Sequence, residues 1–146
     1  MLKALLTFLF SLFIFNGAQA QTVKSILYKG TIDGKTAVTF YIKAENHPCN
    51  GDLMYTSMYR YDKSGNWIQL DATQNKKNEH EFIFVEQGFT GVMILKKDDT
   101  TLNGIWISPD SKKQLKTELK KVPMTAKDIQ FYEDKMEKVN YENNDC

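Results

Sequence analysis

The feature that most constrains this chain is the spacing of its apolar residues. Between residues 23 and 122 they recur at every second position in short runs, and glycine, asparagine and aspartate occupy the gaps. A period of two is typical of β-strands that bury one face. The runs predict eight strands, at residues 23–32, 35–43, 53–62, 66–71, 80–87, 90–97, 101–108 and 114–122.

Most connections between these runs are short. Asp33-Gly34, for example, suits the positive φ angles of a two-residue hairpin. Parallel strands need crossovers of a dozen or more residues, whereas antiparallel neighbours need only a tight turn. The sequence therefore predicts an up-and-down antiparallel meander, in which only the segments 44–52 and 72–79 are long loops.

An eight-stranded meander can close into a barrel and so remove its exposed edges, as in lipocalins and streptavidin. We therefore expect an all-β, lipocalin/streptavidin-like barrel over residues 21–123. Some strands are apolar on both faces, since Phe82 and Phe84 alternate with Ile83 and Val85. A further element must then cover part of the outer surface.

The segment after Pro123 is the expected cover, because its apolar period changes to that of a helix. Thr125 and Asp128 have the spacing of an N-terminal cap. These features predict a helix over residues 126–139, with the segment 124–146 packed on the barrel; a loosely ordered charged tail is the alternative. One helical stripe holds Ile129, Tyr132, Met136 and Val139.

The N-terminus has the three parts of a secretion signal. Lys3 supplies positive charge, residues 5–15 are apolar, and Ala18-Gln19-Ala20 resembles a cleavage site. A transmembrane anchor is the alternative, but the apolar run is shorter than the roughly 20 residues that span a bilayer. We expect residues 1–20 to be cleaved and the protein to be periplasmic or secreted, without a membrane anchor.

Charge argues against nucleic acid as a partner. Residues 1–20 hold one lysine and no acidic residue, so basic and acidic side chains balance in the remaining chain. Nucleic-acid binding usually requires a basic excess on one face, because phosphate contacts dominate the affinity. The lysine pairs are scattered beside apolar runs, as is typical of solvated strand ends.

The two cysteines, Cys49 and Cys146, predict a disulfide if the protein is exported into an oxidising compartment. Such a bond would close a long loop and hold the C-terminal tail. Two unpaired thiols are the alternative.

Motifs of catalysis and metal binding are missing, and we expect neither an enzyme nor a cofactor or metal. His47 and His80 are the only histidines. His47 is two residues from Cys49 on a proline-containing loop, a spacing that rarely aligns a base with a thiol nucleophile. Binding by this loop at the barrel rim is the more plausible role. Its candidate residues are Glu45, His47, Asn50 and Asp52.

A second candidate site is the barrel interior. Glu86 shares a strand face with Phe82 and Phe84, and a buried acid needs a partner. Arg60 is a candidate partner if both side chains point the same way. A ligand cavity is one interpretation of the polar-tipped aromatic residues, and a filled core is the other. The possible cavity residues are Tyr55, Tyr59, Tyr61, Trp67, Glu86 and Trp106.

Several segments carry a family resemblance. Residues 59–70, Glu86 with Thr90-Gly91, residues 102–106 and residues 113–119 resemble a pattern recurrent in small exported β-barrel proteins of Gram-negative bacteria. The resemblance implies a β-barrel and an exported location, and it supplies no active site. The chain lacks the polar biotin-contacting set of avidins, and it lacks the G-x-W signature that lipocalins carry near the mature N-terminus.

These observations predict a non-enzymatic exported binding module that binds a protein partner through its rim loops, for example as an inhibitor that caps a hydrolase. The alternative is a carrier of a small apolar ligand inside the barrel. A weaker alternative is a hydrolase that uses His47.

Overall fold

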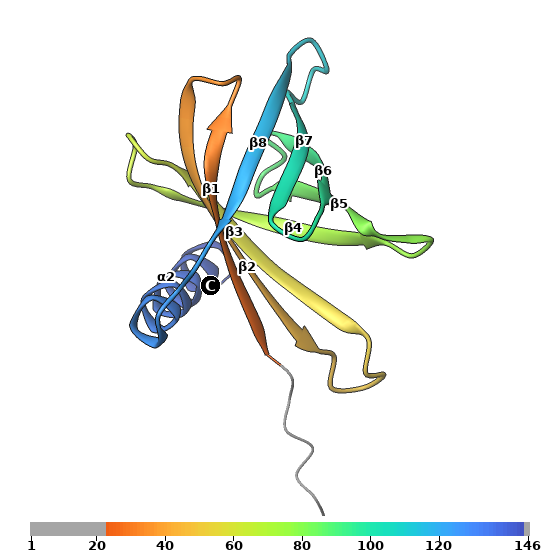
Figure 1. The fold of residues 1–146 in the computed structure, drawn as a ribbon, viewed down its shortest axis with the longest axis vertical. Coiled ribbons are helices and arrows are strands. Elements are labelled where there is room, and N and C mark those ends of the chain that lie inside the picture. Colours follow the sequence, from red (N-terminus) through yellow and green to blue (C-terminus); the bar gives the residue numbers. More distant parts are fainter. Residues whose placement is uncertain (1–22, 145–146) are drawn as a thin grey trace, which may run out of the picture.

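The structure of the protein is a computed structural model that describes residues 23–144; the expected signal segment 1–20 lies outside the described residues. Eight antiparallel strands form a closed barrel, and one helix, α2 (Ala126–Asn144), lies against its outer surface (Figure 1). The strands are β1 (Lys24–Ile32), β2 (Thr36–Asn46), β3 (Leu53–Tyr61), β4 (Trp67–Asn75), β5 (Asn78–Glu86), β6 (Val92–Lys97), β7 (Thr101–Ile107) and β8 (Gln114–Val122).

Each strand pairs with the next one along the chain, and β8 pairs with β1 to close the ring. This arrangement confirms the predicted meander, the barrel and the C-terminal helix. The β1–β2 connection has three residues rather than the predicted two, because Ile32 pairs with Thr36. Asp33 and Gly34 nevertheless adopt the expected positive φ angles, of 56° and 65°. Glycine accepts such an angle without strain, and aspartate tolerates it better than most other residues.

The predicted long loop at residues 72–79 is wrong. β4 continues to Asn75 and β5 begins at Asn78, so that Lys76 and Lys77 alone form the turn. The sequence obscures these strand ends because their residues are mostly polar on both faces, and because the register shifts between Gln74 and Asn75. The other long loop is shorter than predicted and spans residues 47–52.

The barrel interior is packed with apolar side chains. Phe40, Tyr59 and Phe84 are each 0% exposed. The ring of Phe40 lies 5.1 Å edge-on to Phe84 and 6.1 Å from Tyr59. A void that could hold a water molecule beside these rings would leave part of their surface accessible, so the middle of the barrel is filled.

α2 covers a second apolar cluster on the outer surface. Met136 and Val139 pack there with Leu27, Tyr41 and Met58, which project outward from β1, β2 and β3. The helix therefore covers the outward-facing apolar side chains of strands that are apolar on both faces. It runs five residues beyond its predicted end at residue 139.

The start of α2 is capped as the sequence predicts. The Asp128 backbone N–H donates to the Thr125 hydroxyl oxygen at 3.2 Å, and the Thr125 N–H donates to the Asp128 carboxylate at 2.8 Å. Hydrogen bonds from Thr125 lower the pKa of the Asp128 carboxyl group.

Among the described residues, no helix is both long and apolar enough to cross a membrane.

Met136 tests whether α2 is docked on the barrel. Met136→Ala removes a buried side chain and should lower the free energy of unfolding by about 2–4 kcal/mol. Tyr141→Ala is the control on the same helix; Tyr141 is 67% exposed, and its loss should cost less than about 0.5 kcal/mol. Urea denaturation measures both values. Equal, small effects would show that the helix is not docked on the barrel.

Candidate functional site: the open rim

The barrel has two rims, because successive connections alternate between its ends. One rim carries the β2–β3 loop and the β4–β5 and β6–β7 turns, and we call it the open rim. The opposite rim carries the other four connections, including the β7–β8 loop. The hairpins β2–β3 and β4–β5 diverge at the open rim (Figure 1).

The β2–β3 loop is held by its own hydrogen bonds. The His47 N–H donates to the Asp52 carbonyl at 2.7 Å, and the Gly51 N–H donates to the His47 carbonyl at 3.1 Å. The Asn50 amide oxygen accepts a hydrogen bond from the Asp52 backbone N–H, and the Asn50 amide nitrogen donates one to the Asp52 carboxylate. These local bonds present the exposed side chains of the loop in a defined arrangement.

A cleft of about 640 Å³ lies beside this loop, between the ends of β3 and β4. We call it the β3–β4 cleft. Three of the four predicted rim residues line it: His47, Asn50 and Asp52. Its other walls are residues 53–55 of β3, residues 72–75 of β4, Lys76 and Glu79.

Glu45, the fourth predicted rim residue, lies elsewhere. It belongs to β2, forms an ion pair with Lys43 at 3.4 Å, and lines a separate groove beside α2. The prediction groups it with His47 because the two are close in sequence. Since β2 extends to Asn46, Glu45 is a strand residue whose side chain is directed by the pleat of the sheet.

Cys49 is exposed and carries a free thiol. Its predicted partner, Cys146, lies outside the described residues, so the structure does not support the disulfide, which stays a prediction. The Cys49 backbone N–H donates to His47 Nδ1 at 3.2 Å. His47 therefore uses this nitrogen to stabilise the loop backbone.

Glu86 is buried inside the barrel near the opposite rim, at 4% exposed. Its Oε1 accepts hydrogen bonds from the Tyr59 hydroxyl and from Trp106 Nε1, both at 2.6 Å. Its Oε2 accepts one from the Thr90 hydroxyl at 2.7 Å. Three neutral donors therefore satisfy the buried carboxyl group.

The predicted pairing of Glu86 with Arg60 is wrong. Arg60 projects from the outer face of β3, where its guanidinium lies 5.1 Å from the centre of the Trp67 ring and its Nε lies 3.8 Å from Asp62. Tyr59, the neighbour of Arg60 on β3, points inward and takes the role of partner. Residues adjacent on a strand point to opposite faces, so one of the two had to point outward.

The aromatic residues predicted to line a cavity separate into three places. Tyr59, Tyr61 and Trp106 surround Glu86, and the hydroxyl oxygens of Tyr59 and Tyr61 are 3.1 Å apart. Tyr55 lies at the β3–β4 cleft, where its ring packs edge-on against Phe82. Trp67 is not an interior residue. It packs under α2 against Tyr132, outside the barrel.

Gly91 completes the surroundings of Glu86. A Cβ atom at this position would lie 2.5 Å from Trp106 Nε1 and 2.7 Å from Glu86 Oε1. The absence of a side chain therefore allows the indole and the carboxyl group to meet. This close approach gives a physical reason for glycine after Thr90.

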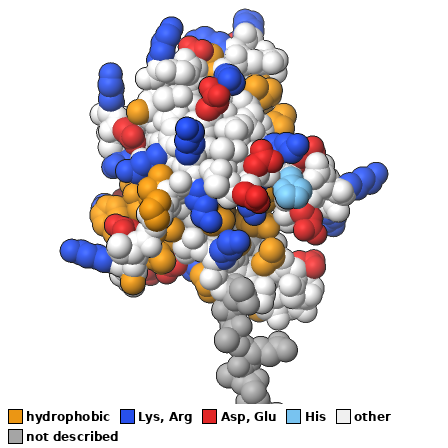
Figure 2. Space-filling view, in the orientation of Figure 1, with side chains coloured by type: hydrophobic (Ala, Val, Ile, Leu, Met, Phe, Trp, Pro, Cys, Tyr) orange, Lys and Arg blue, Asp and Glu red, His pale blue; other side chains and the backbone are white. Residues whose placement is uncertain are grey.

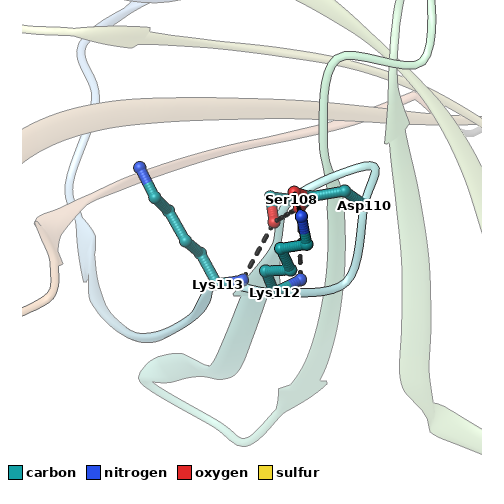
Figure 3. A network of polar contacts seen from close by, with 4 residues as sticks. All are labelled: Ser108, Asp110, Lys112 and Lys113. Atoms are coloured by element: carbon teal, nitrogen blue, oxygen red, sulfur yellow. Dashed lines mark hydrogen bonds and ion pairs between the residues drawn. The ribbon is translucent and has the colours of Figure 1, made fainter.

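The opposite rim has a hydrogen-bonded loop of its own between β7 and β8 (Figure 3). The Ser108 hydroxyl donates to the Asp110 carboxylate at 2.6 Å, and it accepts the Lys113 N–H at 3.0 Å. Hydrogen bonds from Ser108 and from the Lys112 N–H lower the pKa of the Asp110 carboxyl group. These exposed side chains stabilise their own turn, and we assign them no further role.

Charges of both signs are mixed on the surface shown in Figure 2. On the face that Figure 2 shows, acidic and basic side chains alternate without a large region of one sign. The cleft follows this pattern, because its lining includes Asp52, Lys76 and Glu79. Neither the face in Figure 2 nor the β3–β4 cleft has the basic excess that binding to a nucleic-acid phosphate backbone requires.

Comparison with protein-family models, with curated proteins and with solved structures finds no match for the chain. The candidate function therefore rests on the geometry of the open rim and of the barrel interior.

Sequence reasoning identifies one wall of the β3–β4 cleft and misses the others. Leu53 and Met54, which are 51% and 40% exposed, have the pattern of ordinary strand residues. Residues 72–75 have the composition of a loop. The polar run that ends at Lys77 is the signal that could have indicated the cleft. A strand with polar residues on both faces cannot lie over a filled core, so its end must be open to solvent.

Loss of the Glu86 carboxyl group should leave Trp106 Nε1 without its acceptor and the Tyr59 hydroxyl with only the Tyr61 hydroxyl, at 3.1 Å. An unsatisfied buried donor costs about 1–3 kcal/mol, so Glu86→Ala should lower the free energy of unfolding by about 3 kcal/mol or more. Glu86→Gln retains an acceptor and should cost about 1 kcal/mol. Chemical denaturation measures the difference. Equal losses for the two variants would show that the hydrogen bonds do not stabilise the core.

The tyrosine that binds Glu86 should make stability depend on alkaline pH. Burial, followed by the hydrogen bond to Glu86, raises the pKa of Tyr59 above its ordinary value of 10.0. The folded state thus holds this proton more tightly, and its contribution to stability is complete below pH 10 and declines as pH rises further. Tyr59→Phe should reduce the decline by about 1.4 kcal/mol per pH unit. Denaturation between pH 9 and about 12 tests this, and parallel curves for both proteins would contradict it.

Proposed function

We propose that this protein is a non-enzymatic exported binding module that binds a protein partner at its open rim. The observation that carries the proposal is the β3–β4 cleft, whose wall contains His47, Asn50 and Asp52 on a loop fixed by its own hydrogen bonds. A loop that is already ordered loses little conformational entropy on binding. Inhibition of a hydrolase is one form of this function, in which the rim covers the enzyme's active site.

The packed interior favours this function over the carriage of a small apolar ligand. Carriage needs an empty apolar cavity, whereas Phe40, Tyr59 and Phe84 have no accessible surface. Glu86, the polar group with which an interior ligand would interact, already accepts three hydrogen bonds. A ligand could enter only by displacing side chains from the core.

Export remains part of the proposal on the strength of the sequence pattern in residues 1–20. Periplasmic or extracellular partners are accordingly the ones to test. The free thiol of Cys49 is available in the described structure for a disulfide with Cys146 after export.

Site-specific crosslinking can capture a partner whose identity is not yet known. A photoreactive benzoylphenylalanine replaces Asn50 at the open rim in one variant and Lys63 at the opposite rim in another. Both residues are exposed, so neither change should disturb the core. The proposal expects a protein adduct from position 50 and none from position 63. Equal labelling from both positions would contradict binding by the open rim.

Alanine substitution then measures the contribution of the loop. Replacement of His47, Asn50 and Asp52 together should weaken binding of the identified partner by about tenfold or more, because these side chains line the cleft. The matched control replaces Lys63, Ser64 and Asn66, which are exposed at the opposite rim. Calorimetry gives the affinities, and thermal unfolding verifies that both variants fold. Unchanged affinity in the loop variant would refute the proposed function.

A further inference from the structure

The pairing between β3 and β4 stops halfway along the two strands. Each strand has nine residues, but their register runs only from Arg60↔Trp67 to Thr56↔Asp71. Beyond that point, residues 53–55 pair with β2 alone and residues 72–74 pair with β5 alone. The barrel is therefore closed over part of its height and divided at the open rim, as the diverging hairpins in Figure 1 show.

The hydrogen bonds of neighbouring residues show which backbone N–H and C=O groups of β3 face the cleft. The Asp62 N–H donates to Ala37, at the β2 side of the strand. Because backbone groups alternate between the two sides of a strand, even-numbered residues of β3 face β2. Leu53 and Tyr55 then face β4 and, where pairing has stopped, the cleft.

The same reasoning assigns the β4 side. The Gln69 carbonyl accepts from the Gln87 N–H, so odd-numbered residues of β4 face β5. Ala72 and Gln74 therefore face the cleft. Beyond the last β3–β4 pair, the N–H and C=O groups of Leu53 and Gln74 have no neighbouring strand among the described residues.

Side chains bridge the two edges where the backbone pairing has ended. Tyr55 reaches across to Gln74, with its hydroxyl 3.1 Å from the amide oxygen, and its ring packs against Phe82 of β5. The Gln74 amide nitrogen donates to the Glu79 carbonyl at 2.7 Å. Beyond the last backbone pair, Thr56 with Asp71, these side-chain contacts rather than a backbone ladder connect β3 to β4 and β5.

We propose that the β3–β4 cleft binds an extended segment of a partner protein, which adds as a strand to the β3 edge at residues 53–55. This proposal rests on the proposed function and specifies how its partner is bound. An extended chain presents N–H and C=O groups at the spacing of the edge, whereas the backbone groups of a helix are already paired. The exposed Leu53 side chain favours apolar residues at alternate positions of the partner segment.

The mixed charge of the cleft agrees with a polypeptide partner. His47, Asp52 and Lys76 lie within its lining, so neither a strongly acidic nor a strongly basic ligand is favoured. Main-chain hydrogen bonds would supply affinity, and the rim loop would supply contacts specific to the partner's side chains.

A library of random twelve-residue peptides displayed on phage provides the probe. The intact protein is panned against the library, and an enriched peptide is synthesised both unmodified and with single backbone N-methyl groups. Strand addition predicts that N-methylation weakens binding at every second residue, because only alternate N–H groups face the β3 edge. Failure to enrich any peptide, or losses without this period, would overturn the proposal.

Leu53 offers a matched pair of protein variants. Leu53→Pro removes the N–H that faces the cleft, at the first residue of a strand, where proline is tolerated. It should weaken the peptide by about tenfold, whereas Leu53→Val retains the N–H and should bind within about threefold of the original. Equal affinities for the two variants would overturn strand addition.

The crosslinked partner separates the two proposals. If its affinity falls in the loop variant but not in Leu53→Pro, the open rim binds the partner and strand addition is wrong. If its affinity falls in neither, both proposals fail. Sedimentation of the protein alone tests a second copy of the chain as occupant, and a dimer abolished by Leu53→Pro would overturn the assignment to a different protein.

Discussion

The docking of α2 across four strands is the interaction on which the shape of the barrel depends. Ser25 on β1 lies 3.4 Å from Glu133 of the helix, and Gln69 on β4 hydrogen-bonds Asn140 at 3.0 Å. Gln69 is also the register partner of Met58, which the helix buries. The helix thus holds β3 and β4 together where they are paired, and the strands can diverge beyond that level without opening the barrel.

The two ends of the barrel consequently differ in how their polar groups are satisfied. Near the opposite rim, the Glu86 carboxyl group joins β5 to β3 and β7 through hydrogen bonds to Tyr59 and Trp106. At the open rim, long side chains such as Tyr55 and Gln74 bridge strands whose backbones have separated. One end therefore has a fixed internal network, and the other has backbone groups directed at a cleft. This difference is the physical reason for placing binding at the open rim.

Sequence reasoning succeeds where a periodic pattern has one structural solution. Alternation predicts the eight strands, and Thr125 with Asp128 predicts the start of the helix. It fails where the outcome depends on which face of a strand points inward, as with Arg60 and Trp67, because alternation alone is symmetric between the faces. It also fails to predict the cleft, since the length over which two strands remain paired depends on contacts such as Tyr55 with Phe82, which are distant in sequence.

The turn between β4 and β5 has a consequence for solubility. An unpaired strand edge is a template for aggregation, and natural proteins often protect such edges with lysine. Lys76 and Lys77 form the tip of the β4–β5 hairpin, directly beyond the unpaired part of β4. Two copies that approach each other along this edge would bring like charges together, whereas the β3 edge begins with the exposed, uncharged residues Leu53 and Met54. The lysine turn thus protects one side of the cleft from self-association and leaves the other side accessible.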